Sequence, residues 1–600
     1  MAGEPSLELT PNALDVLRAR YLRRDEAGLV VESPEQMFRR VARTVASAEA
    51  GHGAEPGAAE ERFLAAMMAL EFLPNSPTLM NAGTRLGQLA ACFVLPVEDS
   101  LESIFTAVRD SALIHQSGGG VGYDFSRIRP KGAPVASTGG VASGPVSFMK
   151  VFDASVDAIR QGGRRRGANM GILDVRHPDL EEFIAAKRDP GVLANFNLSV
   201  AAPDAFLAAA RAGVDFELRD PASGAVAGHR NASLLLDEIA ACAWETGDPG
   251  MIFLDRINRD NPTPELGEIA ATNPCGEVPL LPYEACMLGS INLAPLASPR
   301  GLDWSRLAEL VDLGVRFLDD CLDASRFPLP RITETVRANR KIGLGLMGFA
   351  DALVELGLAY DSEAAEKLAD ELMAFVSERA AEASRALARE RGPFPSFARS
   401  RAAARGEAPL RNATRTAIAP TGTLSLLAGC SSGIEPFYAL AYERHVLDGH
   451  HLVEVNPRFE RRARAEPGFG PGLRQAVLER GSLAGLPQAP ERLRRLFRTA
   501  PEIAPEWHVR IQAAFQRHVD NAVSKTINLP RDAGVSDVRR AWELAFESDC
   551  KGITIYREGS KQSQVLARGG LGREACPECG AGLRFAESIA QCRACGYSAP

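Results

Sequence analysis

The chain has 600 residues, of which 46% are hydrophobic and 24% are charged, and its formal net charge is −8 at pH 7. This is the composition of a globular protein with room for three or four domains of about 150 residues. The negative charge excludes a general role in binding polyanions, so any anion site must be local, and the lack of an apolar run of about 18 residues favours a soluble cytoplasmic protein with no membrane contact.

The first seventy residues are expected to be helical, because apolar residues recur at helical spacing and Ser33-Pro34 indicates a helix start. From about 71 to 200, frequent Gly, Ser and Pro predict strands joined by functional loops. Long amphipathic helices are predicted at 303–325 and 361–392. Short β-like runs follow in "RTAIAP", "SKTINLP" and "KGITIYR". This alternation predicts an α/β fold.

Residues 575–600 carry a metal-binding pattern. Two Cys-x2-Cys pairs twelve residues apart are typical of two knuckles that close a tetrahedral zinc site, which would supply the folding energy of so small a module. Redox-active thiols are the alternative. The module has no lysine and two arginines, so direct nucleic-acid binding is not expected. The predicted zinc ligands are Cys576, Cys579, Cys592 and Cys595.

Three glycine-rich segments, 117–132, 160–171 and 419–425, could hold phosphate. Each by itself favours a plain turn over a phosphate loop, but three together favour more than one nucleotide site. A fourth segment, "KIGLGLMGFADAL", matches G-x-G-x-x-G at Gly343, Gly345 and Gly348. The charged "RANRKI" before it does not suit a buried parallel strand, so a Rossmann site is rejected and these glycines are interpreted as close helix packing.

The loop "NPCGE" places Cys275 between Asn273 and Glu277. A nucleophilic thiolate requires a basic neighbour, whereas the nearest charge here is an acid, which disfavours the thiolate. The loop therefore favours a neutral thiol that donates a hydrogen atom.

Several segments, in this order, resemble the large catalytic chain of ribonucleotide reductases: "NSPTLMNAG", "ACFVLPVEDSLESIF", "GGRRRGANMGIL", "ATNPCGEVPLLPYEACMLGSINLA", "RKIGLGLMGFAD" and "APTGTLSLLAGCSSGIEP". The resemblance runs from about residue 8 to residue 600. The ending "DCKGITIYREGSK", followed by four cysteines, resembles the adenosylcobalamin-dependent class II branch.

The resemblance implies a ten-stranded α/β barrel of two parallel five-stranded halves, with a finger loop around 273–277 at its centre. Together with the sequence patterns, it divides the chain into a helical region (1–70), the catalytic barrel (71–558), a flexible linker with few large apolar residues (559–574) and the zinc-ribbon-like tail (575–600).

The resemblance also assigns chemistry to the finger loop and its neighbours. Cys275 would carry a thiyl radical that takes the ribose 3′ hydrogen, and Glu277 would act as base on the 3′-hydroxyl. Asn273 would hold the ribose hydroxyls. Cys92 and Cys286 would reduce the 2′ carbon and end as a disulfide, yielding deoxyribonucleotides for DNA synthesis and repair.

Two nucleotide sites follow from the same resemblance. The substrate site is expected at Ser76, Ala91, Gly120, Pro420, Thr421, Gly422 and Thr423. The site for a dNTP or ATP specificity effector is expected at Asp99, Ser100, Leu101 and Arg129, and Gln161 and Arg165 would connect it to base choice. Because this effector site lies near a subunit interface in such relatives, a homodimer is expected.

Departures from the family pattern bear on the radical source. The catalytic-type sequence begins at once, so no overall regulation by an ATP cone is expected. There is no Tyr-Tyr pair for a radical from a second subunit, and "CRACGYS" only partly matches a glycyl-radical motif. Adenosylcobalamin is therefore the expected cofactor, although no motif marks its contacts.

Three further expectations are diphosphate substrates, a thioredoxin or glutaredoxin-like reductant, and a tail that re-reduces Cys92–Cys286. The alternatives are the same reaction with another radical source, or a non-catalytic nucleotide-binding regulator with a zinc-ribbon tail.

Overall fold

The computed structural model describes residues 7–135, 139–159, 167–189, 191–446, 450–467, 469–560, 566–568, 583–586, 589–592 and 598–599. Among these residues, no helix is both long enough and apolar enough to cross a membrane.

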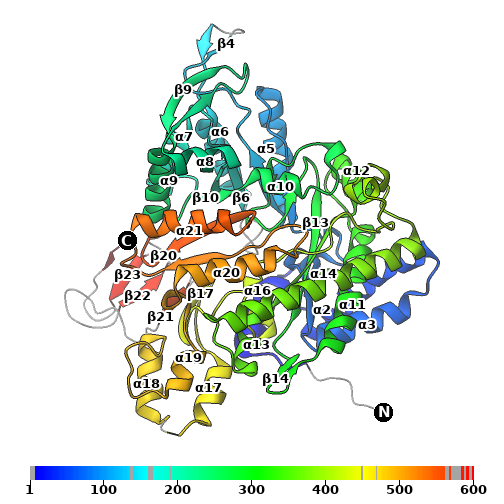
Figure 1. Cartoon of the computed structure of the whole chain (residues 1–600). Coiled ribbons are helices and arrows are strands. Elements are labelled where there is room, and N and C mark those ends of the chain that lie inside the picture. Colours follow the sequence, from blue (N-terminus) through cyan, green and yellow to red (C-terminus); the bar gives the residue numbers. More distant parts are fainter. Residues whose placement is uncertain are drawn as a thin grey trace.

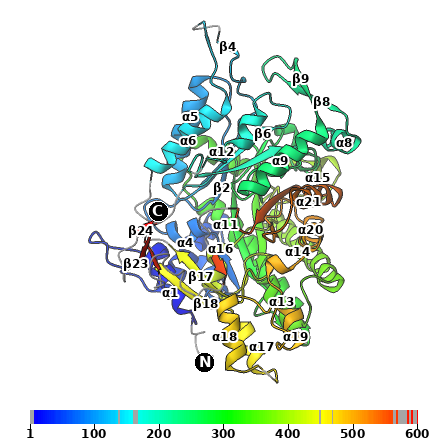
Figure 2. The same ribbon diagram turned by 90° about the vertical axis from the view of Figure 1, so that its left-hand side faces the viewer.

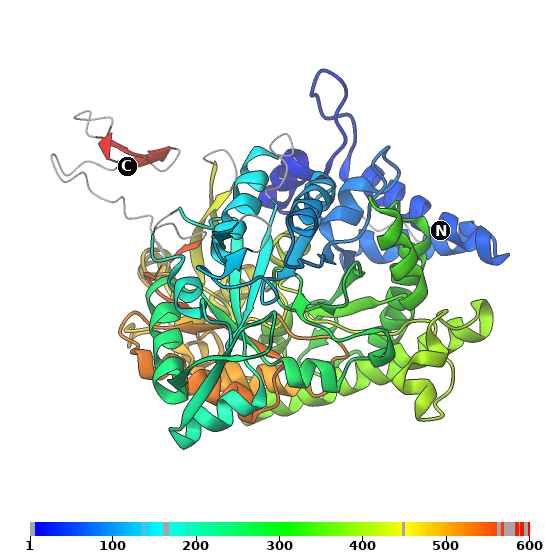
Figure 3. The same ribbon diagram turned by 90° about the horizontal axis from the view of Figure 1, so that it is seen from above.

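The predicted helical start of the chain is confirmed. Ser33 caps the helix Pro34–Ala46 with a capping box, in which the Ser33 hydroxyl accepts from the Gln36 N–H at 3.2 Å and the Ser33 N–H donates to the Gln36 side chain at 2.8 Å. These N-terminal helices (blue in Figure 3) lie on the opposite side of the molecule from the orange segment around α21. They are α1 (Pro11–Val16), η1 (Leu17–Tyr21), α2 (Pro34–Ala46), η2 (Ser47–His52) and α3 (Pro56–Met68).

A ten-stranded sheet forms the centre of the molecule and is accompanied by helices, so the α/β prediction is confirmed. Five neighbouring strands are parallel, and they follow one another in sequence order. They are β2 (Cys92–Val94), β3 (Gly120–Asp124), β6 (Asn169–Asp174), β7 (Phe196–Ala201) and β10 (Gly250–Ile252).

Helices, rather than the loops predicted for 71–200, connect these parallel strands. The first begins after Ser100, whose hydroxyl accepts from the Ser103 N–H at 3.1 Å, and buries Ile104 and Ile114 against the sheet. Parallel strands need such crossovers. Figures 1 and 2 show α5 and α6 side by side over this half of the sheet. The crossover helices are α5 (Leu101–Gln116), α6 (Pro145–Ala158), α7 (Leu180–Ala185), α8 (Asp204–Ala212) and α9 (Ala232–Thr246).

The rest of the sheet runs antiparallel to this half at both junctions, β2–β13 and β10–β20. It contains two parallel pairs, β13–β16 and β19–β20, and the short edge strand β1. The runs "SKTINLP" and "KGITIYR" are therefore confirmed as strands. These strands are β1 (Phe72–Pro74), β13 (Ala285–Asn292), β16 (Ile342–Met347), β19 (Thr526–Leu529) and β20 (Gly552–Arg557).

The strand ladder does not close into a complete barrel, because β16 and β19 are not paired with each other. The run "RTAIAP" lies between them and makes only isolated parallel bridges, Leu344 to Thr416 and Ile418 to Val523. This segment is too irregular to count as a strand.

The glycines of "KIGLGLMGFADAL" do not pack helices, so that interpretation is wrong. Gly343 and Gly345 lie in β16, a fully buried parallel strand. A Cβ at Gly345 would lie 2.2 Å from the carbonyl oxygen of Ala417, so glycine is what lets the 414–418 segment approach β16.

The strands of the ten-stranded sheet, which we call the ring of strands although their ladder does not close, surround a small apolar core that is separate from the main one. It takes side chains from β2, β6, β7, β10, β13 and residue 417, and it includes Ala271, Val278 and Leu280 of a short hairpin. The hairpin strands, β11 (Ala271–Thr272) and β12 (Pro279–Leu280), therefore lie among the sheet strands rather than outside them.

Further helices cover the sheet, and both predicted long helices are confirmed as α11 and α14. The remaining helices are α4 (Ser76–Asn81), α10 (Leu254–Arg259), η3 (Pro264–Leu266), α11 (Trp304–Ala324), α12 (Pro330–Asn339), α13 (Phe349–Leu356), α14 (Glu363–Arg391), η4 (Phe397–Arg399), α15 (Arg401–Ala404), α16 (Gly422–Ala428), α17 (Pro457–Arg464), α18 (Pro471–Arg480), α19 (Glu491–Leu496), η6 (Ala500–Glu502), α20 (Pro505–Gln516) and α21 (Val535–Glu547).

Short antiparallel sheets complete the described chain. One of them includes β21, which lies within the predicted linker and pairs with β17. These strands are β4 (Pro134–Val135), β5 (Gly140–Val141), β8 (Asp215–Arg219), β9 (Val226–Asn231), β14 (Ala297–Ser298), β15 (Gly301–Leu302), β17 (Ala441–Val446), β18 (His450–Val455), β21 (Leu566–Arg568), β22 (Leu583–Ala586), β23 (Ile589–Cys592) and β24 (Ser598–Ala599).

A cluster of buried charges joins the N-terminal helices to α11 and α14. The Arg391 side chain is fully buried and pairs with Glu49 at 2.8 Å, Asp320 at 2.6 Å and Asp319 at 3.2 Å. Asp319 also pairs with Arg340 at 2.9 Å, just before β16. Because each buried charge depends on its partners, the cluster fixes how these elements meet.

Two of the three acids in this cluster, Asp320 and Glu49, titrate in opposite directions. Burial and the neighbouring Glu49 raise the pKa of Asp320 to about 8, against the opposing effect of Arg391. The pKa of Glu49 falls to about 2, because its ion pairs and hydrogen bonds, among them one to Arg316, outweigh its burial. Asp320 therefore keeps its proton near neutral pH and Glu49 does not.

We expect Asp320→Asn to change how stability depends on pH. An unfolded aspartate has a pKa near 3.9, so between about pH 4 and pH 8 the folded state holds one more proton, and stability through this group falls as pH rises. Asparagine does not titrate. The free energy of unfolding of the variant should therefore fall less steeply with pH than that of the wild type, by up to about 1.4 kcal/mol per pH unit. Urea unfolding from pH 5 to pH 8 measures the difference, and parallel profiles for the two proteins would contradict it.

Candidate active site

The hairpin that carries Cys275 is held against β3 by glycines. A Cβ at Gly122 would lie 1.7 Å from the carbonyl oxygen of Thr272, and one at Gly120 would lie 2.8 Å from the Pro274 ring. Part of the first glycine-rich segment, Gly120–Asp124, is thus a strand, whose glycines make room for the hairpin. Their role here is to let two backbones approach closely.

We expect Gly122→Ala to displace the hairpin and to lower turnover by about 100-fold, since a shift of about 1 Å at a reacting group has an effect of that order. Gly228→Ala is the matched control, because a Cβ at Gly228 meets no atom within 4 Å. Steady-state turnover and melting temperature of both variants check this, and equal activity in the two would show that the hairpin tolerates the methyl group.

Hydrogen bonds fix the loop between the two hairpin strands. The Asn273 side-chain oxygen accepts from the Val278 N–H at 2.9 Å, and the Gly276 N–H donates to the Asn273 carbonyl at 3.0 Å with Gly276 in a left-handed conformation. The Asn197 amide donates to the Pro274 carbonyl at 2.8 Å. Between these bonds Cys275 is exposed, whereas Asn273 and Glu277 are 1% and 2% exposed.

Cys92 and Cys286 lie directly opposite each other on the antiparallel strands β2 and β13. Opposed residues in such a pair have Cβ atoms about 4.5–5.5 Å apart, so a disulfide needs only a small adjustment. Both are free thiols here, and the Asn273 side chain donates to the Cys92 sulfur at 3.1 Å. The structure therefore brings the loop and the cysteine pair together.

The electrostatic surroundings keep both buried thiols protonated. Burial and then the charge of Glu277 raise the pKa of Cys92 well above its usual value. Burial also raises the pKa of Cys286, although the nearby ammonium of Lys341 opposes the increase. Neutral thiols suit donation of hydrogen to a substrate better than nucleophilic attack.

Sequence reasoning missed a buried ion pair beside this site. Lys341 and Glu284, each 1% exposed, are joined at 2.6 Å, and the Asn339 amide donates to the other Glu284 oxygen at 2.6 Å. Because Met287 pairs with Ile342, Lys341 precedes β16 at the level of Cys286. The signal was present in "RANRKI", whose Arg340 and Lys341 are paired inside the protein.

The proposed substrate-phosphate residues gather around two helix starts. Thr421 has a left-handed backbone, and its hydroxyl accepts from the Gly433 N–H at 2.7 Å just before α16. A Cβ at Gly422 would meet no atom within 4 Å, so the backbone there borders open space. Ser76 begins α4, and its hydroxyl lies 2.8 Å from that of Tyr21.

The other predicted substrate residues lie next to Cys92 or next to Thr421. The Ala91 carbonyl accepts from the Gly120 N–H at 2.8 Å, immediately before Cys92. Pro420 and Thr423 flank the left-handed turn at Thr421, the latter in the first turn of α16.

The predicted effector residues form a separate group at the start of α5. The Arg129 guanidinium donates to the Asp99 carboxylate at 2.7 Å, and Ser100 caps the helix at Leu101. Leu101 and Phe105, one helical turn apart, are 64% and 51% exposed. Gln161 and Arg165 lie outside the described residues.

The tail cysteines are not placed by the structure. Cys576, Cys579 and Cys595 lie outside the described residues, and Cys592 is described only as the end of β23. Within the part of the chain that is described, no group of three or more His, Cys, Asp or Glu residues could hold a metal ion.

Comparison with known proteins identifies the family of this chain. Family models for the ribonucleotide reductase all-alpha domain and barrel domain match residues 7–87 and residues 90–408 and 405–556. The vitamin B12-dependent ribonucleoside-diphosphate reductase of Mycobacterium tuberculosis (strain CDC 1551 / Oshkosh) is 52% identical over 565 residues, covering 94% of this chain and 81% of the relative. Its namesake from Thermoplasma acidophilum is 46% identical over 627 residues, covering 95% and 81%.

The fold is shared with a solved structure, the class Id ribonucleotide reductase alpha subunit of Actinobacillus ureae. The two chains superpose with a TM-score of 0.75 at 23% sequence identity, covering 94% of this chain and 99% of the other. Because the barrel-domain model matches more than half of the chain and these relatives are 52% and 46% identical over 94% and 95% of it, the chain belongs to the ribonucleotide reductase family, in its vitamin B12-dependent branch.

Proposed function

We propose that this chain reduces ribonucleoside diphosphates to 2′-deoxyribonucleotides by thiyl-radical chemistry. One observation carries the proposal: an exposed thiol, Cys275, lies on a loop inside the ring of strands, and Asn273 of that loop bonds to one of two opposed buried thiols. The names of the relatives at 52% and 46% identity supply the diphosphate substrate.

In this proposal the radical on Cys275 removes the 3′ hydrogen of the ribose. Glu277, buried two residues away, takes the 3′-hydroxyl proton, and Asn273 orients the ribose hydroxyls. The 2′-hydroxyl leaves as water, and Cys92 and Cys286 supply two electrons and two protons and become a disulfide. The 3′ hydrogen then returns from Cys275 and Glu277 gives its proton back to the 3′ oxygen, so atoms and electrons balance.

Adenosylcobalamin is the proposed source of the initiating radical, since the vitamin B12-dependent relatives are so named. The chain fits an external radical source because the Cys275 sulfur is the exposed member of an otherwise buried site. When bound, the cofactor would supply a radical that removes the hydrogen atom of this thiol.

Two nucleotide sites and a dimer complete the proposal. The open backbone at Gly422 and the hydroxyls of Thr421, Thr423 and Ser76 would hold the substrate phosphates. A dNTP or ATP effector would bind at the Asp99–Arg129 pair. The exposed apolar residues of α5 beside it would be buried in a homodimer.

The C-terminal tail, residues 575–600, would reduce the Cys92–Cys286 disulfide after each turnover. Its cysteine spacing supports zinc binding at Cys576, Cys579, Cys592 and Cys595, and the same thiols would reduce Cys92–Cys286 before a thioredoxin or glutaredoxin-like protein reduces them. A thiol enzyme of this kind needs a reducing compartment, which supports the cytoplasm. Cys592→Ser/Cys595→Ser should lower the zinc content and stop repeated turnover with thioredoxin; intact repeated turnover would refute the shuttle.

An anaerobic assay tests the function. The purified chain is given a ribonucleoside diphosphate, dithiothreitol and adenosylcobalamin, with and without dTTP. Product that requires adenosylcobalamin and changes base preference with dTTP is expected. Product only after a second subunit or an activating enzyme is added would overturn the proposed radical source, and no product under any of these conditions would overturn the function.

A further inference from the structure

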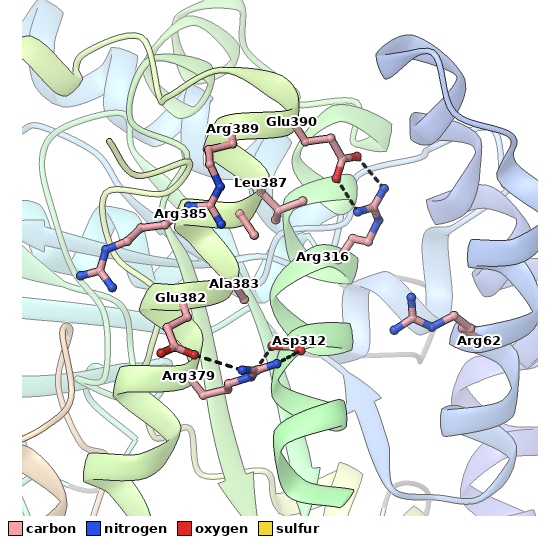
Figure 4. Close-up of a pocket in the computed structure, with 11 residues that line it drawn as sticks. Arg62, Asp312, Arg316, Arg379, Glu382, Ala383, Arg385, Leu387, Arg389 and Glu390 are labelled. Atoms are coloured by element: carbon pink, nitrogen blue, oxygen red, sulfur yellow. Dashed lines mark hydrogen bonds and ion pairs between the residues drawn. The ribbon is translucent and has the colours of Figure 1, made fainter. Parts of the chain in front are cut away.

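A cavity of about 560 Å³ lies between α3, α11 and α14, and none of the active-site or effector residues lines it. Figure 4 shows its wall of arginine side chains. Five arginines and three acids line it, an excess of positive charge in a chain whose net charge is −8. The arginines are Arg62, Arg316, Arg379, Arg385 and Arg389.

Two of the five guanidiniums are already neutralised. Arg316 pairs with Glu390 at 2.8 Å and with the buried Glu49 at 2.6 Å. Arg379 pairs with Asp312 and, at 3.0 Å, with Glu382. These pairs use all three acids that line the cavity.

The other three arginines make no ion pair with any residue that the structure describes. Arg385 and Arg389 are four residues apart on α14, so they lie on one face of the helix, where like charges cost about 0.2–0.5 kcal/mol. Arg62 comes from α3, and Figure 4 shows its guanidinium extending toward α11. An anion between α3 and α14 would offset this repulsion.

We propose that this cavity binds the phosphate chain of a di- or triphosphate. Guanidinium groups form bidentate hydrogen bonds with phosphate oxygens, and three of them match an anion with several charges. The volume is that of a small-molecule site rather than of a single phosphate. The lining contains no aromatic residue, only Ala383, Ala386 and Leu387 besides the charged groups, so nothing there stacks a nucleobase. Recognition is therefore of the phosphate chain.

This site is independent of the proposed reductase activity, and binding has a structural consequence. The ligand would join α3, in the N-terminal helical region, to α14, above the buried pairs of Glu49 with Arg316 and Arg391. A ligand that binds only the folded chain raises its stability with concentration.

Calorimetric titration of the full chain with inorganic tripolyphosphate at low ionic strength tests the proposal. Tripolyphosphate can also bind at the proposed active and effector sites. The wild type is therefore compared with the cavity variant Arg62→Ala/Arg389→Ala. The matched control is Arg300→Ala/Arg337→Ala, which removes two exposed arginines outside the cavity. The cavity variant should lose one binding site and the control none; equal stoichiometry in all three proteins would overturn the site.

Chemical labelling of the wild type covers the case of a cavity variant that does not fold. Tripolyphosphate should protect Arg62 and Arg389 from phenylglyoxal, as read by mass spectrometry, and should leave Arg300 reactive. ATP should protect them at a similar concentration. Protection by ATP at tenfold lower concentration than by tripolyphosphate, or no protection by either, would refute recognition of the phosphate chain.

Discussion

Cys275→Ser is expected to abolish deoxyribonucleotide formation and to leave the fold intact. The hydroxyl is isosteric with the thiol but does not form a radical under the same conditions, so the proposed first step has no donor. Because Cys275 is exposed, its substitution should change the free energy of unfolding by less than about 0.5 kcal/mol. Anaerobic turnover with adenosylcobalamin and a thermal unfolding curve measure the two effects.

The control for this variant is Cys242→Ala, which alters a buried cysteine of α9 outside the site. It should retain turnover even if its melting temperature falls. A binding measurement with dTTP should show that Cys275→Ser still takes the effector, since that site lies at the start of α5. If Cys275→Ser retained turnover close to wild type, Cys275 would not be the radical-bearing residue.

Arg391→Met is expected to give the largest loss of stability, about 3–5 kcal/mol. The side chain is 0% exposed and pairs with Glu49, Asp319 and Asp320, so its removal takes a cation from a buried cluster and leaves Glu49 and Asp319 with fewer ion pairs. Methionine fills much of the volume but supplies no charge. Urea unfolding at pH 7 measures the loss, and limited proteolysis should show cleavage first where the N-terminal helices meet α11.

The matched control for Arg391→Met lies two residues earlier on the same helix. Arg389 is exposed and has no ion pair among the described residues, so Arg389→Met should change stability by no more than about 0.5 kcal/mol in phosphate-free buffer. A similar small effect for both variants would mean that the buried cluster is not needed for stability.

Local patterns in the sequence were sufficient where one segment decides its own structure. Ser33-Pro34 starts a helix through its capping box, and α11 and α14 follow from apolar spacing alone. The same local patterns misled between 71 and 200. Glycines there suggested loops, whereas they permit close strand and hairpin contacts, and the crossovers between the strands are helices.

Contacts between distant segments could not be derived from spacing. Cys92 and Cys286 face each other only because β2 pairs with β13 in one register, and family resemblance alone had linked them. Likewise "RANRKI" looked too charged to precede a buried strand. Arg340 and Lys341 are nevertheless 4% and 1% exposed, because Asp319 and Glu284 from other elements neutralise them.

The sequence by itself determined the chemistry available to this protein: a thiol beside a carboxylate on a Gly/Pro loop, further cysteines, and a string of motifs that resembles one family. Only the tertiary structure decided which groups meet, which thiols are buried, and that Cys275 is exposed while Cys92 and Cys286 are not. It also assembled arginines from α3 and α14 around one cavity. The physical reason is that local propensity acts within a few residues, whereas burial and charge pairing depend on strands and helices that come together only in the fold.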